Sequence, residues 1–247
     1  MAATSFQTIT VSRVGDVWVI TFQVNAISPQ FLAEIHKALD QIEATEGASA
    51  VVFASAKKIF SGGLDLRMAI QQPAEHRQLS MVFNFCQLMK LMGRLVSFSI
   101  PTVAAVAGHC YAGGFIFITA CDHRVMSDSN TNLCLNEVNM PSAIPAGTAR
   151  VLVAKLSPKI VKDMLLTGRE VGPQEALATQ VVDMLAPKEE VLAKTVEWAQ
   201  SLASLGEKRE AYGLLKRQMY GTVAALCAQA AWEYDEIICS SKFISKL

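Results

Sequence analysis

Two glycine-rich turns in this sequence could present backbone amide groups to an anion. The first is Phe60-Ser61-Gly62-Gly63-Leu64-Asp65-Leu66, where Asp65 is a plausible helix N-cap and would leave free N–H groups near Leu64. The second spans residues 108–115, where Gly113-Gly114 leads into an apolar stretch that predicts a buried helix. Free N–H groups at such a helix start lie in a low dielectric, where they stabilise a developing negative charge. Two turns of this kind predict an oxyanion hole, although a plain turn or close helix–strand packing explains each one alone.

A single carboxylate could supply acid–base chemistry. Glu137 lies in the segment Asn136-Glu137-Val138-Asn139-Met140-Pro141, whose other residues are apolar or uncharged. Burial there would remove hydration from the carboxylate and raise its pKa, so that it could accept a proton near neutral pH. A solvated loop carboxylate is the alternative interpretation of the same residue.

Hydrophobic patterning predicts the elements that must position these segments. Short β-rich or apolar runs predict strands over residues 8–14, 17–22, 50–54, 100–106, 123–126 and 181–185. Helical spacing, proline starts and glycine stops predict helices from Pro29 to Gly47, over 78–93 and 113–120, and from Pro158 and Pro173. From Lys188 onward the pattern predicts helices alone, broken near Gly206 and Gly221. The sequence therefore predicts an α/β core over residues 1–187, which carries the site, and a helical region over 188–247 that packs on this core or on a neighbouring subunit.

Composition argues against several other classes of protein. Lys+Arg and Asp+Glu both number 22, so the formal net charge of zero argues against a nucleic-acid-binding protein. Six cysteines without a CxxC pair, beside four scattered histidines, predict free thiols and no metal site. Residues 95–121 contain no Asp, Glu, Lys or Arg, but a proline and three glycines interrupt them. We therefore expect a buried strand, a turn and a buried helix there, and no membrane span.

The three segments together resemble the crotonase family, which is the enoyl-CoA hydratase and isomerase superfamily. The resemblance covers residues 8–188, and the helical tail agrees with it in kind. The first turn resembles the family's first CoA and oxyanion segment, and residues 108–122, which close with Cys121-Asp122, resemble the second. Met164-Leu165-Leu166-Thr167-Gly168 and Glu175-Ala176-Leu177-Ala178 resemble its later helices. The resemblance implies the crotonase fold, a spiral of ββα units with a C-terminal helical region.

The resemblance also implies roles for individual residues. The two oxyanion N–H donors map onto Leu64 and Gly113, and the catalytic carboxylate maps onto Glu137. The implied substrate-binding residues surround these donors: Ser61, Gly62, Gly63, Asp65, Gly114 and Ile116. Hydratases of the family carry a first glutamate at the position of Ile116, whose side chain cannot hold or activate water. One carboxylate, in an Asn-Glu context with a proline at Pro145, is similar to the Δ3,Δ2-enoyl-CoA isomerases.

The expected reaction shifts the double bond of a 3-enoyl-CoA to the 2-trans position through a dienolate that the two amides hold. Coenzyme A is part of the acyl-CoA substrate, so no separate cofactor is expected, and Lys57 or Lys58 could attract its negative charge. Another crotonase reaction, such as hydration or thioester hydrolysis with Glu137 alone, is an open alternative. An acyl-CoA-binding protein without activity is another.

The C-terminal tripeptide carries a targeting signal. It reads Ser245-Lys246-Leu247, the address that the peroxisomal import receptor recognises, and a frayed helix end is the alternative interpretation. We therefore expect the peroxisome matrix, or a related organelle, as the location and unsaturated fatty-acid β-oxidation as the setting. The resemblance further implies a homotrimer or a dimer of trimers.

Overall fold

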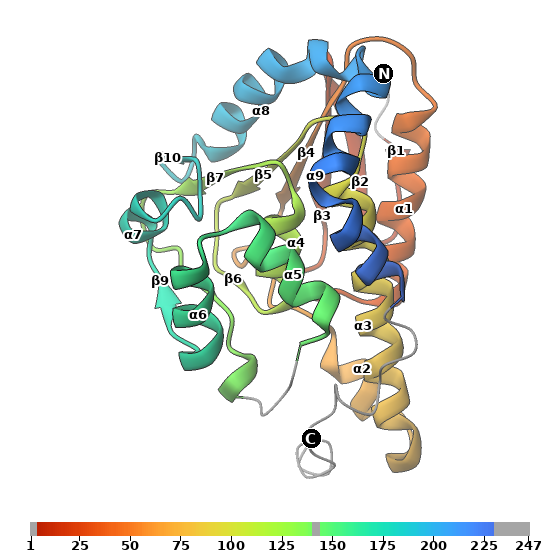
Figure 1. The fold of residues 1–247 in the computed structure, drawn as a ribbon, viewed down its shortest axis with the longest axis vertical. Coiled ribbons are helices and arrows are strands. Elements are labelled where there is room, and N and C mark those ends of the chain that lie inside the picture. The colour runs from red at the N-terminus through yellow and green to blue at the C-terminus, as the bar shows by residue number, and fades with distance from the viewer. Residues whose placement is uncertain (1–3, 140–143, 230–247) are drawn as a thin grey trace.

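The computed structural model describes residues 4–139 and 144–229, which form a large and a small β-sheet with helices packed on them (Figure 1). The large sheet has seven strands in the order β1-β2-β3-β4-β5-β7-β10. The pairs β1–β2 and β2–β3 are antiparallel, and the pairs from β3 to β10 are parallel. Its strands are β1 Thr4–Ser5, β2 Ile9–Val14, β3 Val17–Phe22, β4 Ala50–Ser55, β5 Thr102–Val106, β7 His123–Ser127 and β10 Met184–Ala186. The small sheet joins three strands of two residues each, β6 Cys110–Tyr111, β8 Leu133–Cys134 and β9 Glu170–Val171, in the order β6-β8-β9.

Helices are interspersed among the strands up to β10, and only helices follow this strand within the described residues. The helices of the first part are α1 Pro29–Glu43, α2 Leu66–Ile70, α3 Ala74–Val96, α4 Gly113–Ala120, the 3₁₀ turn η1 Glu137–Asn139, α5 Ala146–Lys155, α6 Pro158–Thr167 and α7 Pro173–Ala178. After β10 come α8 Val191–Leu202, η2 Ala203–Gly206 and α9 Arg209–Gln229. Parallel strands require such crossover connections, so this order agrees with the predicted α/β core and helical tail.

The large sheet is buried on both faces. On β4, Val51 and Phe53 point into a core shared with α1, α3 and α4, whereas Val52 and Ala54 point to the opposite face, where α8 packs. This alternation follows from the two-residue period of a strand. The helix α4 is buried along its whole length, as its uninterrupted apolar sequence predicted.

The C-terminal helices pack on the core of the same chain. The helix α9 lies against α3 and α5, where an added Cβ on Gly93 would come within 3.0 Å of the Cys227 side chain. A Cβ on Gly147 of α5 would likewise lie 3.0 Å from the Cys227 backbone, so the two glycines permit close helix packing. The first of the two predicted docking modes for the tail is therefore observed up to Gln229. Residues 230–247, which include the predicted targeting tripeptide, lie outside the described residues.

Two expectations about elements were wrong, and one sheet was not predicted. No strands were predicted for the small sheet, because two residues carry no recognisable period. The strand predicted over 181–185 begins only at Met184, because the N–H groups of Val181 and Val182 both donate to the Ala176 carbonyl at the end of α7. The break predicted near Gly221 does not occur, and α9 runs through this residue.

The apolar stretch 95–121 is divided among several short elements, and the described cysteines form no disulfides. Residues 95–121 form the end of α3, the strands β5 and β6 and the helix α4, and no described helix is long and apolar enough to cross a bilayer. The cysteines among the described residues are free: Cys86, Cys110, Cys121, Cys134 and Cys227. Within the same residues, no three His, Cys, Asp or Glu side chains are grouped so that they could hold a metal ion.

Candidate active site

Three chain segments run side by side and in the same direction at the small sheet. Ser61 forms a parallel bridge with Cys110 on β6, and β6 pairs in parallel with β8. Leu64 and Gly113 each lie three residues beyond the bridged positions Ser61 and Cys110, and Glu137 lies four residues beyond Leu133, the partner of Cys110. Because parallel segments present the same end to the same edge, the topology directs the three residues for which chemistry was predicted toward the same end of this sheet.

The backbone around Leu64 turns its amide away from its neighbouring strand. The Ile27 N–H donates to the Gly63 carbonyl at 2.8 Å, and the Asp65 N–H donates to the Ile27 carbonyl at 2.9 Å. In a parallel bridge of this kind, the residue between the two bonded neighbours directs its own N–H to the other side. The N–H of Leu64 therefore points away from Ile27 and toward the segment that holds Gly113.

The amide of Gly113 lies next to that of Leu64. An ideal Cβ on Gly113 would lie 3.6 Å from the Leu64 nitrogen, and one on Gly63 would lie 3.1 Å from the Gly113 nitrogen. Gly113 is the first residue of α4, so no carbonyl of its own helix accepts its N–H. The preceding residue, Ala112, has φ 49° and ψ −126°, a strained backbone for alanine that aims this amide out of the helix start. The nitrogens of the two predicted N–H donors thus lie close together.

Glu137 is a buried carboxylate, unpaired within the described residues. Its residue is 3% exposed, and neither carboxylate oxygen has a hydrogen-bond partner among the described residues. Desolvation raises the pKa of this carboxyl from 4.5 to about 7, against a smaller opposing effect of its own backbone N–H. No charged side chain contributes to the shift, which is the behaviour predicted for a carboxylate in an apolar segment. The solvated-loop interpretation is wrong.

The remaining predicted residues of the first turn shape the backbone of the site. The Ser61 hydroxyl accepts from the Gly63 N–H at 3.2 Å and donates to the Asn25 carbonyl at 3.2 Å, and the Gly62 N–H donates to the same carbonyl at 2.8 Å. Gly63 has φ +90°, a conformation that favours glycine. Asp65 caps α2 as predicted, since its carboxylate accepts from the Arg67 N–H at 3.2 Å. That carboxylate also pairs with the Arg67 side chain at 2.9 Å, so its contact with a substrate stays a prediction.

The predicted residues of the second turn are packed in the interior. An added Cβ on Gly114 would lie 2.5 Å from the Ser61 Cβ, so only glycine lets α4 approach the first turn this closely. Ile116, one turn further along α4, is fully buried. The structure therefore places an alkyl side chain where the resemblance implies that hydratases carry a glutamate.

Some residues that shape the site carried no signal in the sequence. Leu88 of α3 forms a wall, because its Cδ2 lies 3.1 Å from the place of a Cβ on Gly113. Leu88 lay within a predicted helix, but a core leucine and a site leucine have the same pattern. Ile27 and the strain at Ala112 depend on how distant segments meet, so the sequence alone does not indicate them.

His109, next to the second turn, is held in place by hydrogen bonds. Its ring Nδ1 accepts from the Asn132 backbone N–H at 3.1 Å and lies 3.2 Å from the Tyr111 hydroxyl. The Tyr111 hydroxyl in turn lies 3.0 Å from a Glu170 carboxylate oxygen, to which it donates.

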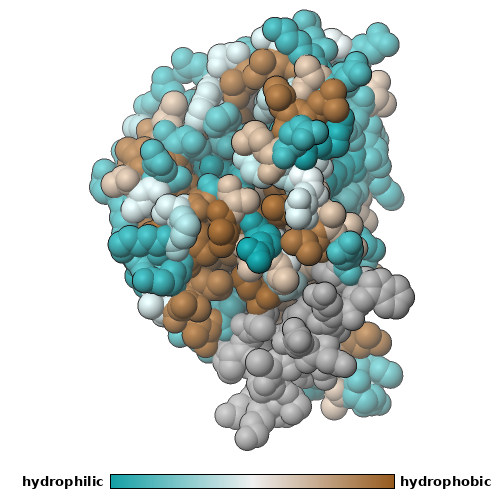
Figure 2. Space-filling view, in the orientation of Figure 1, coloured by the Kyte–Doolittle hydropathy of each residue, from teal (hydrophilic) through white to brown (hydrophobic). Residues whose placement is uncertain are grey.

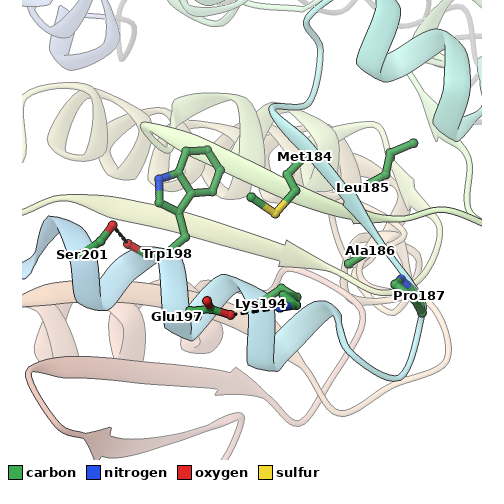
Figure 3. A pocket seen from close by; sticks show the side chains of 8 residues that line it. All are labelled: Met184, Leu185, Ala186, Pro187, Lys194, Glu197, Trp198 and Ser201. Carbon is green, nitrogen blue, oxygen red and sulfur yellow. Dashed lines mark hydrogen bonds and ion pairs between the residues drawn. The ribbon is translucent and has the colours of Figure 1, made fainter.

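A pocket of about 480 Å³ lies away from the three segments, between β10 and α8 (Figure 3). In this view, Trp198 of α8 and Met184 of β10 lie next to each other. The lining residues are Met184, Leu185, Ala186, Pro187, Lys194, Glu197, Trp198 and Ser201, and none of them was predicted for the site. A much smaller cavity, of about 10 Å³, adjoins the site, because Leu64 is part of its wall.

Comparisons with known proteins place the chain in one family. The sequence model of the family described as enoyl-CoA hydratase/isomerase matches residues 15–245. A protein of Thermus thermophilus named putative enoyl-CoA hydratase is 36% identical over 179 residues, which are 72% of this chain and 68% of that protein. Enoyl-CoA delta isomerase 3 of Arabidopsis thaliana is 27% identical over 219 residues, which are 85% of this chain and 91% of that protein. The crystal structure of human mitochondrial delta3-delta2-enoyl-CoA isomerase has a TM-score of 0.85 at 23% identity, covering 97% of this chain and 95% of that one.

This chain therefore belongs to the enoyl-CoA hydratase/isomerase family. Its fold is the crotonase fold, so the predicted fold and family are confirmed. It is an enzyme of the hydratase/isomerase class, and binding of an acyl-CoA substrate is consistent with the family.

Proposed function

We propose that the enzyme is a Δ3,Δ2-enoyl-CoA isomerase, which converts 3-enoyl-CoA to 2-trans-enoyl-CoA. The observation that carries the proposal is the isolation of Glu137, a buried carboxylate whose pKa is raised to about 7 by desolvation alone. An isomerase needs one proton shuttle, because the proton taken from C2 can be returned at C4. A hydratase must also position a water molecule across the double bond. The alkyl side chain of Ile116 has no polar atom that could hold this water.

In the proposed reaction, the thioester oxygen accepts hydrogen bonds from the N–H groups of Leu64 and Gly113. The Glu137 carboxylate removes a proton from C2, and the electrons of the broken C–H bond delocalise into a dienolate whose oxygen the two amides stabilise. The Glu137 carboxylic acid then protonates C4, the C2–C3 double bond forms and the carbonyl is restored. A pKa near 7 suits both steps, because the group is then a competent base and a competent acid at neutral pH.

The other predicted residues shape and enclose the site around the two amides. In the proposal, Ser61, Gly62, Gly63 and Gly114 allow the two turns to approach each other and the substrate. Asp65 fixes the start of α2 behind Leu64, and Ile116 closes the site against water. Coenzyme A enters as part of the substrate, and no further cofactor takes part. The exposed Lys57 and Lys58 precede the first turn, where they can attract the anionic carrier.

The substitution Glu137→Gln tests this function. It keeps the size of the side chain but removes the base, so we expect 3-enoyl-CoA isomerisation to fall by about 10²–10⁴-fold. Binding of a saturated acyl-CoA should change little, because the two amides remain. Glu170→Gln is the matched control, since this exposed glutamate on β9 belongs to the same small sheet and lies outside the proposed site. Isomerisation by Glu137→Gln at the rate of the control would refute the proposed role of Glu137.

Hydration is the second candidate reaction, because the relative from Thermus thermophilus is named a putative enoyl-CoA hydratase. Hydration with Glu137 alone would use the same oxyanion hole. Incubation of the enzyme with 3-enoyl-CoA and with 2-trans-enoyl-CoA, followed by product analysis, distinguishes the two reactions. The proposal expects conjugated 2-enoyl-CoA from the first substrate and little 3-hydroxyacyl-CoA from the second.

We further propose that the enzyme acts in unsaturated fatty-acid β-oxidation in the peroxisome matrix, as a homotrimer or a dimer of trimers. The tripeptide at 245–247 supports import by the peroxisomal receptor. Large hydrophobic residues exposed on α9, among them Leu215 at 65% and Met219 at 67%, support an assembly. Figure 2 shows hydrophobic patches among hydrophilic residues on the face that carries α5, α6 and α9. A monomer in light scattering would contradict the assembly and leave the reaction untouched.

A further inference from the structure

We propose that Asn84 sets the acyl specificity of this enzyme by accepting a hydrogen bond from a small donor, such as a hydroxyl, at the far end of a short acyl group. The inference rests on the proposed function in one respect, namely that the thioester oxygen binds at the Leu64 amide. It adds a substrate class to that function: short acyl-CoA esters that carry a terminal hydrogen-bond donor.

The orientation of the Asn84 amide is fixed by its surroundings. Asn84 lies on α3 and is 5% exposed, and its Nδ2 donates to the Ile27 carbonyl at 3.0 Å. The same carbonyl accepts the Asp65 N–H at 2.9 Å. Turning the amide round would place Oδ1 against the Ile27 oxygen, which would bring two acceptors together. The carbonyl end of Asn84 therefore faces away from Ile27.

That carbonyl end lacks a donor. Oδ1 of Asn84 is buried and has no hydrogen-bond partner in the described part of the chain. Most buried polar atoms in folded proteins are paired, because a lone buried acceptor loses its hydrogen bond to water without replacement. The unpaired oxygen therefore indicates that a bound molecule supplies the missing donor.

Asn84 lines a small cavity that Leu64 also lines. Its wall is mostly apolar and is formed by Pro29, Leu64, Asp65, Leu66, Met68, Ala69, Ser80, Met81 and Asn84. Because Leu64 supplies both an oxyanion amide and part of this wall, an acyl group held at that amide begins at the cavity. The Asp65 carboxylate is already paired with Arg67 at 2.9 Å, which leaves Ser80 and Asn84 as the polar side chains available to a ligand.

The volume of the cavity limits what it can hold. About 10 Å³ is close to the space of one water-sized probe, so a hydroxyl or a methyl group fits and a run of methylene groups does not. A water bound in the free enzyme would satisfy Oδ1. A substrate hydroxyl would replace that water and its hydrogen bond, whereas a methyl group would displace the water and leave Oδ1 unpaired. Whether or not a water occupies the cavity of the free enzyme, the hydroxylated substrate is therefore favoured over its methyl analogue.

The test compares pairs of saturated acyl-CoA esters that differ only in a terminal hydroxyl or methyl group and that cannot be isomerised. The pairs are 4-hydroxybutanoyl and pentanoyl, 5-hydroxypentanoyl and hexanoyl, and 6-hydroxyhexanoyl and heptanoyl. Calorimetric titration gives the ratio of the two Kd values for each pair. For at least one pair, we expect the wild type to bind the hydroxyl member about tenfold more tightly.

Four variants locate the preference. Asn84→Leu, which is close in size but apolar, should abolish or reverse the ratio, and Asn84→Asp, which keeps an acceptor oxygen, should retain it. Ser80→Ala and Met81→Leu alter the same wall and should leave the ratio unchanged. The ratio is insensitive to partial unfolding, because a smaller active fraction affects both members of a pair equally.

The inference is overturned by equal binding of both members at every length, by failure of every ester to bind, or by an unchanged ratio in Asn84→Leu. Loss of the preference in Ser80→Ala with retention in Asn84→Leu also overturns it, because Ser80 would then be the acceptor. An isomerase assay on the same wild-type preparation separates this inference from the proposed function. Isomerisation without the hydroxyl preference refutes only the role of Asn84, and the preference without isomerisation refutes only the reaction.

Discussion

Glu137 of η1 and Asp122, which follows α4, are both largely buried carboxylates, but their hydrogen bonds and charged neighbours differ. Neither oxygen of Glu137 has a hydrogen-bond partner among residues 4–139 and 144–229, and burial raises its pKa to about 7. Asp122, at the C-terminal end of α4, lies 2.7 Å from the Lys216 Nζ and accepts the Thr102 N–H at 2.9 Å and the Tyr212 hydroxyl at 3.2 Å. Burial alone would raise the pKa of Asp122 as well, but the nearby lysines and hydrogen bonds outweigh it and lower that pKa.

The two carboxylates differ in what they contribute to the protein. Asp122, which follows α4, joins the core to α9 through Lys216 and Tyr212 of α9. Glu137 lies buried in η1 and is unpaired within the described residues, so its carboxylate can gain and lose a proton. A paired carboxylate stabilises the fold, and an unpaired one is available for proton transfer.

The largest effect on stability is expected for Asp122→Asn. It leaves the ammonium groups of Lys216 and Lys155, whose side chains are each 6% exposed, without their carboxylate. We expect the free energy of unfolding to fall by about 3–5 kcal/mol, measured by chemical denaturation. Glu197→Gln, which breaks an exposed pair with Lys194, is the control and should change the free energy of unfolding far less. Equal effects of the two substitutions would show that the buried cluster does not stabilise the fold.

A somewhat smaller effect is expected for the pH dependence of stability at Glu137. Its pKa is raised from 4.5 to about 7 in the folded protein, so between these values the folded state binds more protons than the unfolded state. Stability from this group is therefore present below pH 4.5 and is lost as the pH rises through 7, by about 3 kcal/mol in total. The difference in unfolding free energy between wild type and Glu137→Gln isolates this contribution. A difference that stays constant from pH 4.5 to 7 would mean that Glu137 is solvated or paired.

The smallest effect is expected where the second turn is strained. Ala112 has φ 49°, and Ala112→Gly relieves this strain at the cost of more chain entropy in the unfolded state. We expect a net gain of about 1 kcal/mol in the free energy of unfolding, with the isomerase rate preserved because the Gly113 amide keeps its direction. Ala38→Gly in α1 is the control and should lose about 1 kcal/mol, since its backbone is helical. Destabilisation by both substitutions would indicate that Ala112 is not strained.

Local chemistry in the sequence was sufficient to predict much of this site. The apolar neighbours of Glu137 predicted its burial and its raised pKa, and the spacing around Asp65 predicted the cap of α2. The glycines of both turns predicted close backbone approaches, which the structure confirms at Gly63 and Gly114. Each of these predictions depends on residues within a few positions of one another, so the sequence pattern is enough.

The features that the sequence did not predict depend on distant pairs of residues. Asp122 meets Lys216 and Tyr212 only because α9 folds back onto α3 and α5. Asn84 lies in an ordinary helical pattern, and its link to Ile27 joins residues 57 positions apart. The small sheet consists of two-residue strands that exist through pairing alone. All three features arise from tertiary contacts, which leave no local pattern in the sequence.

The most direct test of the central claim is the pH dependence of kcat/KM for isomerisation of 3-enoyl-CoA by the wild-type enzyme. If one isolated carboxylate with a pKa of about 7 is the base, kcat/KM must rise about tenfold per pH unit below that value and become constant above it. A profile that is already constant from pH 5 upward would show that the base is an ordinary, solvated or paired carboxylate, and would contradict the account.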